Sequence, residues 1–349
     1  MAHSSLLTPS ISTSGRMHGL DLARYVALVG MVIVNFSLAL GVENLATPLH
    51  RLVEQLEGRA AATFVVLAGV GFALAFGNRP GSTRSILKRA CFLFGLGLLN
   101  MLIFEADILH FYAAYFALGT LVLMLSTQWL LIFTMALPLV FVGLTILFDY
   151  DAGWNWISLT YTELWSPAGF VRNLLFNGWH PVVPWFAFFT FGMALARLPL
   201  RKRRTHVQLI LSGLGLVVGS ILLSHITANL LGPLSGLKPI PPGPFFVMGG
   251  CGAAITVIGL CLLAAEQACL SKSVQLLAPA GRQTLTLYFA HILIGMGTLE
   301  IAGLLGSGTV ETAFWAALLF MGVATLYAAL WSLRFNYGPL EWLMRRLAH

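Results

Sequence analysis

The sequence carries very little charge for its length. Only 9% of its 349 residues are Asp, Glu, Lys or Arg, whereas soluble globular domains carry about 25% charged residues. A chain this long has too few charged groups to cover a surface that faces water, which excludes a soluble globular domain. Metal-ligand spacing is also lacking, because the four cysteines lie in or beside apolar runs and read as small core residues: Cys91, Cys251, Cys261 and Cys269.

Long apolar runs take the place of the missing charge. They extend over about 17 to 24 residues, the helix length that a ~30 Å hydrocarbon core requires. In lipid, only helices or a closed barrel satisfy the backbone, and a barrel would alternate apolar and polar residues in segments of ~10. The sequence therefore predicts an all-α, polytopic membrane bundle of about ten transmembrane helices. These spans are expected near 20–42, 60–77, 86–104, 108–126, 129–147, 182–198, 207–229, 244–265, 284–305 and 312–333.

Lys and Arg set the orientation of the predicted bundle. With the N-terminus inside, sixteen of the twenty Lys and Arg residues fall on the cytoplasmic side and four outside. This bias predicts that both termini are cytoplasmic and that the number of spans is even. Because the basic residues lie in short loops between apolar runs, the net charge of +7 does not indicate nucleic-acid binding.

The composition divides the chain into three parts. Residues 1–16 are rich in Ser and Thr and are predicted to be a disordered cytoplasmic segment. Residues 17–334 are predicted to form the membrane bundle, and 335–349 a cytoplasmic C-terminal tail. No cleavable signal peptide is expected, since the first apolar run is too long and no small-residue cleavage site follows it.

Ionisable groups at the outer span edges are the first functional candidates, because such groups are costly near a bilayer. His50 lies in the first outer loop, where an imidazole can act as a base or a nucleophile; the alternative is a solvated loop histidine. Asp107 and His110 lie one turn apart, so the carboxylate could orient the imidazole or instead cap the helix.

Further candidates lie along the outer half of the predicted bundle. Trp179 and His180 begin the sixth span on its outer side. His291 falls about eight residues into the ninth span, where a buried histidine needs a partner or a polar cavity. The outer loop from about 149 to 180 is rich in Trp and Tyr. It is typical of an interfacial aromatic belt, and the alternative is a platform for an acceptor with a ring, such as a sugar.

Basic residues crowd the inner ends of several spans. Arg24 lies three residues after Asp21 on one helix face, which predicts either an anchoring ion pair or a role in binding an anion. The others reflect the positive-inside bias or form a rim that binds phosphate: Arg84, Lys88, Arg89, Arg282 and Arg334. A basic inner rim opposite outer histidines suits an enzyme with a phosphorylated donor, and it equally suits a proton-coupled transporter.

Several motifs, in order and spacing, resemble the YeiB-like membrane proteins. The likeness is dispersed over nearly the whole chain, and the order of its parts is more specific than any one of them. The matching stretches are RMHGLDLARYVALVGMVIVN (16–35), EGRAAATFVVLAGVGFAL (57–74), ADILHFYAAYFALG (106–119), HPVVPWFAFFTFGMALAR (180–197), AGRQTLTLYFAHILIG (280–295) and FNYGPLEWLMRRLAH (335–349).

The YeiB-like group is similar to heparan-α-glucosaminide N-acetyltransferase, and this resemblance implies a mechanism. It implies acyl transfer from cytoplasmic acyl-CoA to an acceptor across the membrane, with a catalytic histidine in the loop after a span that ends in Val-Asn. In this sequence Val34-Asn35 ends that span, and His50 precedes the run FVVLAG, which starts at Phe64. His291 falls at the last position of a Tyr-x-x-His motif of the family.

The sequence also departs from the family pattern. A Trp and an Asp that the heparan enzyme has after its histidine are absent, and Glu54, Glu57 and Arg59 occupy the region. Position 25 is Tyr where the family usually has Gly. The acceptor pocket of the heparan enzyme therefore cannot be carried over to this chain.

Together, residues and resemblance predict an acyl-CoA-dependent O- or N-acyltransferase of a bacterial cytoplasmic membrane. The expected donor is acetyl-CoA, with no metal, and the expected acceptor is a glycan or small amphiphile outside; a homodimer is one assembly that the prediction allows. The alternative is a proton-coupled transporter. The expected catalytic residues are His50, Asp107 and His110; the donor phosphates are expected at Arg24, Arg84, Lys88, Arg89, Arg282 and Arg334; the acceptor is expected at Trp179, His180 and His291.

Overall fold

Helices make up most of the chain in the computed structural model, which describes residues 16–42, 47–77 and 81–348. One short antiparallel hairpin interrupts them, in which Trp154 pairs with Tyr161. The elements are α1 (His18–Ala39), α2 (Pro48–Leu56), α3 (Arg59–Phe76), α4 (Thr83–Met101), α5 (Leu109–Val122), α6 (Thr127–Leu147), β1 (Trp154–Asn155), β2 (Thr160–Tyr161), α7 (Pro167–Arg172), α8 (Val182–Leu195), α9 (Arg203–Leu231), α10 (Pro244–Glu266), α11 (Ser271–Arg282), α12 (Thr284–Ala290), α13 (Gly297–Ile301), α14 (Val310–Ser332) and α15 (Pro339–Ala348).

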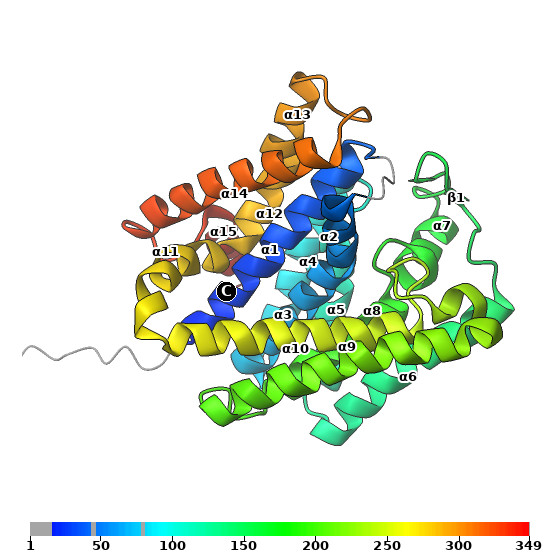
Figure 1. Cartoon of the computed structure of the whole chain (residues 1–349), viewed down its shortest axis with the longest axis horizontal. Coiled ribbons are helices and arrows are strands. Elements are labelled where there is room, and N and C mark those ends of the chain that lie inside the picture. The colour runs from blue at the N-terminus through cyan, green and yellow to red at the C-terminus, as the bar shows by residue number, and fades with distance from the viewer. Residues whose placement is uncertain (1–15, 43–46, 78–80, 349) are drawn as a thin grey trace, which may run out of the picture.

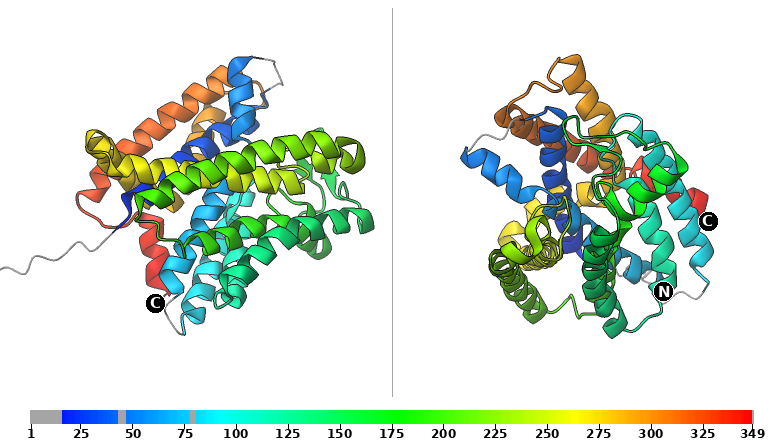
Figure 2. Two further views of the ribbon diagram at one scale, coloured as in Figure 1. Left: turned by 60° about the horizontal axis from the view of Figure 1, so that its bottom comes forward. Right: turned by 90° about the vertical axis from the view of Figure 1, so that its right-hand side faces the viewer.

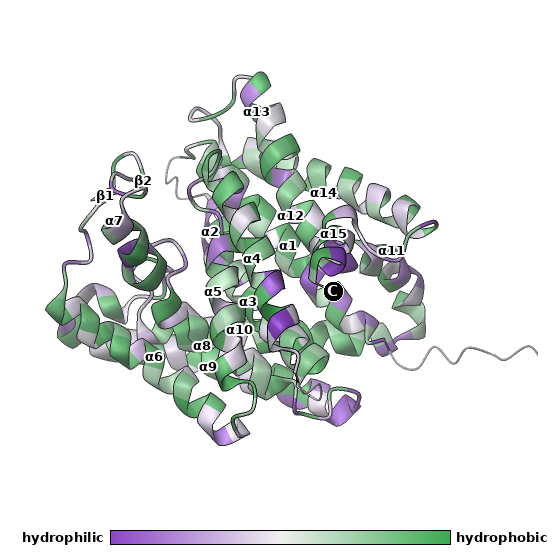
Figure 3. Ribbon diagram, turned by 180° about the vertical axis from the view of Figure 1, so that it is seen from behind, coloured by the Kyte–Doolittle hydropathy of each residue, from purple (hydrophilic) through white to green (hydrophobic). Residues whose placement is uncertain are grey.

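Long apolar segments identify an integral, multi-pass membrane protein. Among the described residues, seven segments are long and apolar enough to cross a bilayer, and α5 and α8 are shorter apolar helices. The start of α4 carries three basic residues, so only its later part is strongly apolar. Figure 3 shows hydrophobic residues along most of the long helices, whereas hydrophilic residues gather on α15. Every span expected from the sequence coincides with a helical segment of the structure.

Several local features go beyond the predicted spans. The first outer loop contains α2, and the C-terminal tail contains α15. The ninth span continues through a π-helical segment, His291–Met296, between α12 and α13. The spans expected near 86–104 and 108–126 are two separate helices, because α4 ends at Met101 and α5 begins at Leu109. Disorder is predicted from the sequence for residues 1–16. Residues 1–15 lie outside the part of the chain that the structure describes.

The helices pack closely at small residues. In Figures 1 and 2, α9 and α10 run side by side along one side of the bundle. A Cβ atom on Gly69 of α3 would lie 2.1 Å from the Phe189 carbonyl oxygen of α8, and one on Gly192 of α8 would lie 2.1 Å from the Val66 carbonyl oxygen of α3. Reciprocal contact of this kind requires glycine on both helices, which is how membrane helices bring their backbones together.

The α3–α8 contact predicts a sharp difference between two glycine substitutions. Gly69→Ala forces the two helices apart, so it should destabilise the fold by about 1–3 kcal/mol or more. Gly95→Ala in α4 meets no atom within 4 Å and should leave stability equal or higher, because Ala is the better helix former. Melting temperatures of the detergent-solubilised variants test this. Equal melting temperatures for the two variants would contradict the packing assigned to Gly69.

Candidate active site

A cavity of about 510 Å³ opens between the end of α1, helix α2 and two outer loops. The β1–β2 hairpin contributes Ile157 and Leu159, and the loop before α10 contributes Lys238, Pro239 and Ile240. Most of the wall is apolar. The polar side chains that line this outer cavity are Asn35, Ser37, His50, Glu57, Trp179, His180 and Lys238.

Local sequence explains how His50 reaches the outer cavity. Thr47 caps the N-terminus of α2, and its hydroxyl oxygen accepts a hydrogen bond from the His50 backbone N–H at 3.1 Å. Pro48 occupies the first turn, where its missing N–H costs nothing. The cap fixes the position of His50 on α2, and the side chain lines the cavity with a buried Nδ1 that has no hydrogen-bond partner among the described residues.

His180 and Trp179 form the facing part of the wall. The Tyr115 hydroxyl donates a hydrogen bond of 2.6 Å to the His180 carbonyl oxygen, and the Trp185 ring lies edge-on to the imidazole at 4.6 Å between centroids. Burial, and to a lesser degree the nearby His110 imidazole, lowers the pKa of His180 from 6.5 to about 3. The structure thus brings His50, Trp179 and His180 to one cavity, as the sequence predicted for an acceptor site.

A narrow cavity of about 50 Å³ continues inward from the outer one. This neck shares Asn35, Gly58, Ala106 and His180 with the outer cavity, and Tyr288 lines its inner side. Tyr288 also lines a third cavity of about 150 Å³, the inner cavity, which extends to Arg24. The three cavities therefore follow one another through the bundle from His50 to Arg24.

An acidic residue holds Arg24 at the far end of this series. Arg24 Nη1 donates to Asp21 Oδ1 at 2.9 Å, and Arg16 Nε donates to Asp21 Oδ2 at 2.7 Å. The anchoring ion pair predicted for Asp21 and Arg24 is present in the structure. Arg24 lines the inner cavity while it makes this ion pair with Asp21.

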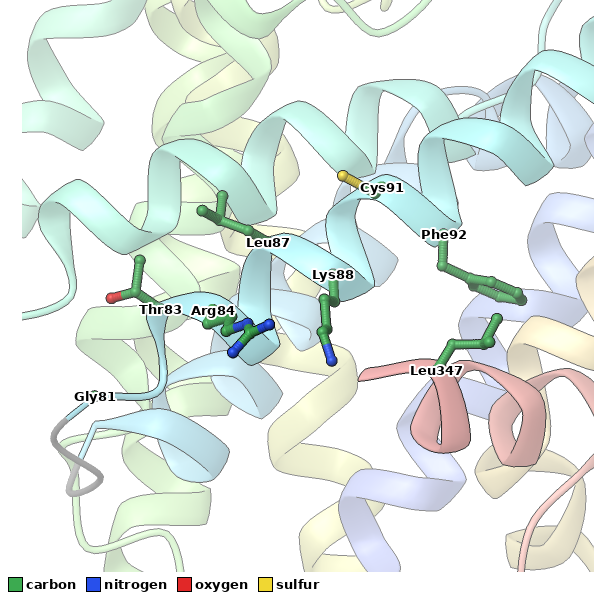
Figure 4. Close-up of a pocket in the computed structure, with 8 residues that line it drawn as sticks. All are labelled: Gly81, Thr83, Arg84, Leu87, Lys88, Cys91, Phe92 and Leu347. Atoms are coloured by element: carbon green, nitrogen blue, oxygen red, sulfur yellow. The ribbon is translucent and has the colours of Figure 1, made fainter. Parts of the chain in front are cut away.

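A larger basic cavity of about 860 Å³ lies beside the inner one. Arg84, Lys88 and Phe92 of α4 line it together with Leu347 of α15. Figure 4 shows Arg84 and Lys88 on the side of α4 that faces α15, with Leu347 next to Phe92. Adjacent residues of the same helices, Leu93 and Met344, line the inner cavity. The α4–α15 contact thus separates the two cavities by little more than a side chain.

Three other arginines of the predicted phosphate rim lie apart from these cavities. Arg89 lies over the Phe76 ring at 5.1 Å. Arg282, at the end of α11, is half-buried, and desolvation, followed by repulsion from Arg16, lowers its pKa. Arg334 lies beyond the end of α14. None of the three is among the residues that line the cavities found in the described part of the chain.

Asp107 and His110 are buried rather than exposed to a cavity. Asp107 accepts hydrogen bonds from Asn100 Nδ2 at 2.9 Å and from the Leu109 backbone N–H at 2.7 Å. The second bond satisfies an amide at the start of α5, which is the capping role. His110 Nδ1 lies 3.6 Å from Asp107 Oδ2, too far for a hydrogen bond. The structure brings this pair close together, but it does not bring them to His50.

His291 is also buried, with an exposed fraction of 0%. Its ring lies between α1 and α12, where Nε2 is 3.0 Å from Asn35 Nδ2 and Nδ1 contacts the Tyr288 carbonyl oxygen. Phe36 stacks on the imidazole. His291 is linked to the outer cavity through Asn35, and to the neck through both Asn35 and Tyr288.

The aromatic loop is a self-contained stack. Trp156 lies between Trp154, at 4.6 Å and 13°, and Tyr150, at 6.3 Å and 16°. The indole N–H of Trp154 donates to the Asn177 carbonyl oxygen and that of Trp156 to Asp151 Oδ1. Trp156 also lines a separate cavity of about 450 Å³ together with Tyr150 and Pro241. The same loop places Ile157 and Leu159 in the wall of the outer cavity.

The models of two known families match this chain. The model of the heparan-alpha-glucosaminide N-acetyltransferase catalytic family matches residues 16–224, which is more than half of the chain. The chain belongs to this family. A family of unknown function, DUF418, matches residues 199–349, and together the two matches confirm the resemblance seen in the sequence motifs. Comparison with curated proteins finds no significant match.

Sequence reasoning missed several residues of this acetyltransferase-family cavity. Asn35 and Tyr288 line the neck, and Glu57 and Lys238 line the outer cavity. The sequence does contain a signal for Asn35, because a carboxamide side chain within an apolar run needs a hydrogen-bond partner, as a charged side chain does. Lys238 had no local signal, since its 3.1 Å ion pair with Glu54 joins residues that are distant in the chain.

The low pKa of His180 predicts a specific pH dependence. The folded protein keeps this imidazole neutral, whereas the unfolded chain takes up a proton below about pH 6.5. Wild-type stability should therefore fall, relative to His180→Gln, as the pH is lowered from 7.5 toward 5. Melting temperatures of the two proteins across this range test the prediction. A difference between them that stays constant with pH would contradict a buried, neutral His180.

Proposed function

We propose that this family member transfers an acetyl group from cytoplasmic acetyl-CoA to an acceptor on the other side of the membrane. The observation that carries the proposal is the succession of three cavities, linked by shared lining residues, from Arg24 to His50. A membrane enzyme with its donor on one side and its acceptor on the other requires such a passage. Family membership favours acetyl transfer over the proton-coupled transport that the sequence left open.

The proposed donor site is the basic cavity together with the inner cavity. Arg84 and Lys88 would bind the phosphates of the donor, because guanidinium and ammonium groups recognise phosphate oxygens. The pantetheine arm would then extend past α15 into the inner cavity, where Arg24 lies, and toward Tyr288. In the proposed orientation, with ten spans and cytoplasmic termini, this end of the bundle faces the cytoplasm.

The proposed acceptor site is the outer cavity. Its largely apolar wall with one carboxylate and one ammonium, Glu57 and Lys238, suits an amphiphilic acceptor. The acceptor hydroxyl or amine would approach His50 from this cavity, and the acetyl thioester would reach it through the neck. His180 and Trp179 would bind the acceptor opposite His50.

His50 would move the proton or the acetyl group. In direct transfer, its imidazole takes the proton of the acceptor O–H or N–H, the freed lone pair attacks the thioester carbonyl carbon, and the C–S bond breaks to leave CoA thiolate, which is protonated. In a two-step route, the imidazole nitrogen first attacks the thioester carbonyl carbon and the C–S bond breaks to release CoA thiolate, which is protonated; the acceptor O–H or N–H then attacks the acetyl carbon, the C–N bond to the imidazole breaks, and the acceptor proton leaves with the regenerated imidazole. Both routes need an imidazole at this position, and a placed base contributes ~10²–10⁴ in rate.

Replacement of His50 tests the assignment. His50→Ala should lower acetyl transfer by about 10²-fold or more, while the thermal stabilisation by acetyl-CoA persists, because bound ligand stabilises the folded state. The matched control is His225→Ala, whose exposed side chain lies on α9. Transfer of radiolabelled acetyl groups into cell-envelope acceptors gives the rate. Full transfer by His50→Ala would refute the role of His50.

Removal of two inner charges tests the donor site. Arg84→Gln combined with Lys88→Gln should raise the KM for acetyl-CoA roughly tenfold, since solvent-exposed charge pairs contribute about 0.2–1 kcal/mol each and about 1.4 kcal/mol corresponds to a factor of ten. The matched control is Lys202→Gln combined with Lys272→Gln, which removes the same charge at exposed positions. Steady-state kinetics measure both. An equal KM in the two double variants would place the donor phosphates elsewhere.

A further inference from the structure

A chain of buried polar groups connects α5 to the neck. The Tyr288 hydroxyl donates to Asp107 Oδ1 at 3.3 Å and accepts from the Ile108 backbone N–H at 3.2 Å. The carbonyl oxygen of the same Tyr288 contacts His291 Nδ1, and His291 Nε2 is 3.0 Å from Asn35 Nδ2. The exposed fractions of Asp107 and His291 are 0% and that of Tyr288 is 1%. Two members of this chain line cavities: Tyr288 lines the neck and the inner cavity, and Asn35, the last member, lines the neck and the outer cavity.

The chemistry of these contacts fixes the roles of both His291 nitrogens. A carbonyl oxygen can only accept a hydrogen bond, so Nδ1 carries the proton. In a neutral imidazole, Nε2 then has a lone pair and can only accept. Within the described chain, the ring nitrogens contact a carbonyl and a carboxamide rather than a carboxylate, so no anionic partner offsets the cost of burying an imidazolium here.

The orientation of the Asn35 carboxamide follows from this tautomer. One Nδ2–H must point at His291 Nε2, since the amide oxygen would face a lone pair. The amide oxygen and the second N–H are then fixed as well, because the carboxamide is planar. Asn35 lies where the outer cavity meets the neck, on the path between the thioester and His50.

We infer that His291 is a positioning residue that acts through Asn35. It holds the carboxamide so that the free amide groups meet the acetyl thioester or the acceptor in a single orientation. His291 therefore does not contact the substrate, in contrast to the acceptor-binding role expected from the sequence. This inference rests on the proposed acetyl transfer for its kinetic consequence, whereas the hydrogen-bond geometry stands independently of it.

A double-mutant cycle measures the coupling between the two residues. His291→Leu and Asn35→Leu should each lower kcat by about 10- to 100-fold, since small misplacements have effects of this size. The KM for acetyl-CoA should stay unchanged. The double variant should be no slower than Asn35→Leu alone, because the inferred effect of His291 on the reaction passes through the Asn35 carboxamide. His291→Gln should regain part of the rate, because its amide can accept from Asn35.

Solid-state NMR of protein with ¹⁵N-labelled histidine tests the geometry without any activity. His291 should show a protonated Nδ1 and an unprotonated Nε2, and Asn35→Leu should shift the Nε2 signal. The signal is assigned by its loss in His291→Gln. Melting temperatures of all variants identify those that fail to fold, and the wild-type spectrum alone still reports the tautomer.

The outcomes separate this inference from the proposed function. A protonated Nε2, an Nε2 signal insensitive to Asn35→Leu, or a double variant slower by the product of the single effects would each overturn the positioning role. Wild-type protein without acetyl transfer would refute the proposed function and leave the NMR result standing. The expected tautomer, the shifted signal and the non-additive kcat together support the inference.

Discussion

The Asp107 carboxylate holds three helices together where the neck and the inner cavity meet. It accepts hydrogen bonds from Asn100 of α4, from the start of α5 and from Tyr288 of α12. A carboxylate within the apolar bundle would be very costly without such partners. By fixing Tyr288, which lines both cavities, these bonds also fix the wall between them. The contact between Tyr288 and His291, and through it the setting of Asn35, depends on the same carboxylate.

The two ends of the series of cavities are lined by different kinds of side chain. At the inner end, cations of α1 and α4 line cavities next to α15. Glu341 holds α15 in place by accepting hydrogen bonds from the Leu285 and Thr286 backbone amides and from the Thr286 hydroxyl. These amides belong to the first turn of α12, where a carboxylate is favoured. At the outer end, the imidazoles of His50 and His180 line the cavity together with Lys238 and Glu57.

Apolar run lengths predicted the helices well, because length and hydropathy are local properties. The Asp21–Arg24 ion pair was equally accessible, since three-residue spacing places both on one helix face. The same spacing misled for Asp107 and His110: the structure places them together but away from the cavities, because Asp107 instead accepts bonds from other partners. His50 required the family resemblance, since nothing local distinguishes it from a solvated loop histidine.

The sequence patterns did not predict contacts between residues that are far apart in the chain. Asn35 and His291 are 256 residues apart in the chain, and their hydrogen bond depends on how α1 packs against the π-helical segment. A π-helical turn shifts the side chains that follow it around the axis, and no periodicity in the sequence announces it. The lining of the neck by Asn35 and Tyr288 is a product of this packing.

The outer hairpin has a consequence for how relatives of this chain can diverge. Its aromatic rings pack against one another. Glu105 links the hairpin to the bundle by accepting a hydrogen bond from the Tyr161 backbone N–H at 3.1 Å. Ile157 and Leu159 project from this module into the outer cavity, whereas Arg84, Lys88 and α15 lie at the other end of the passage. Insertions or replacements within the hairpin can therefore reshape the outer cavity while the cavity between α4 and α15 is inherited unchanged.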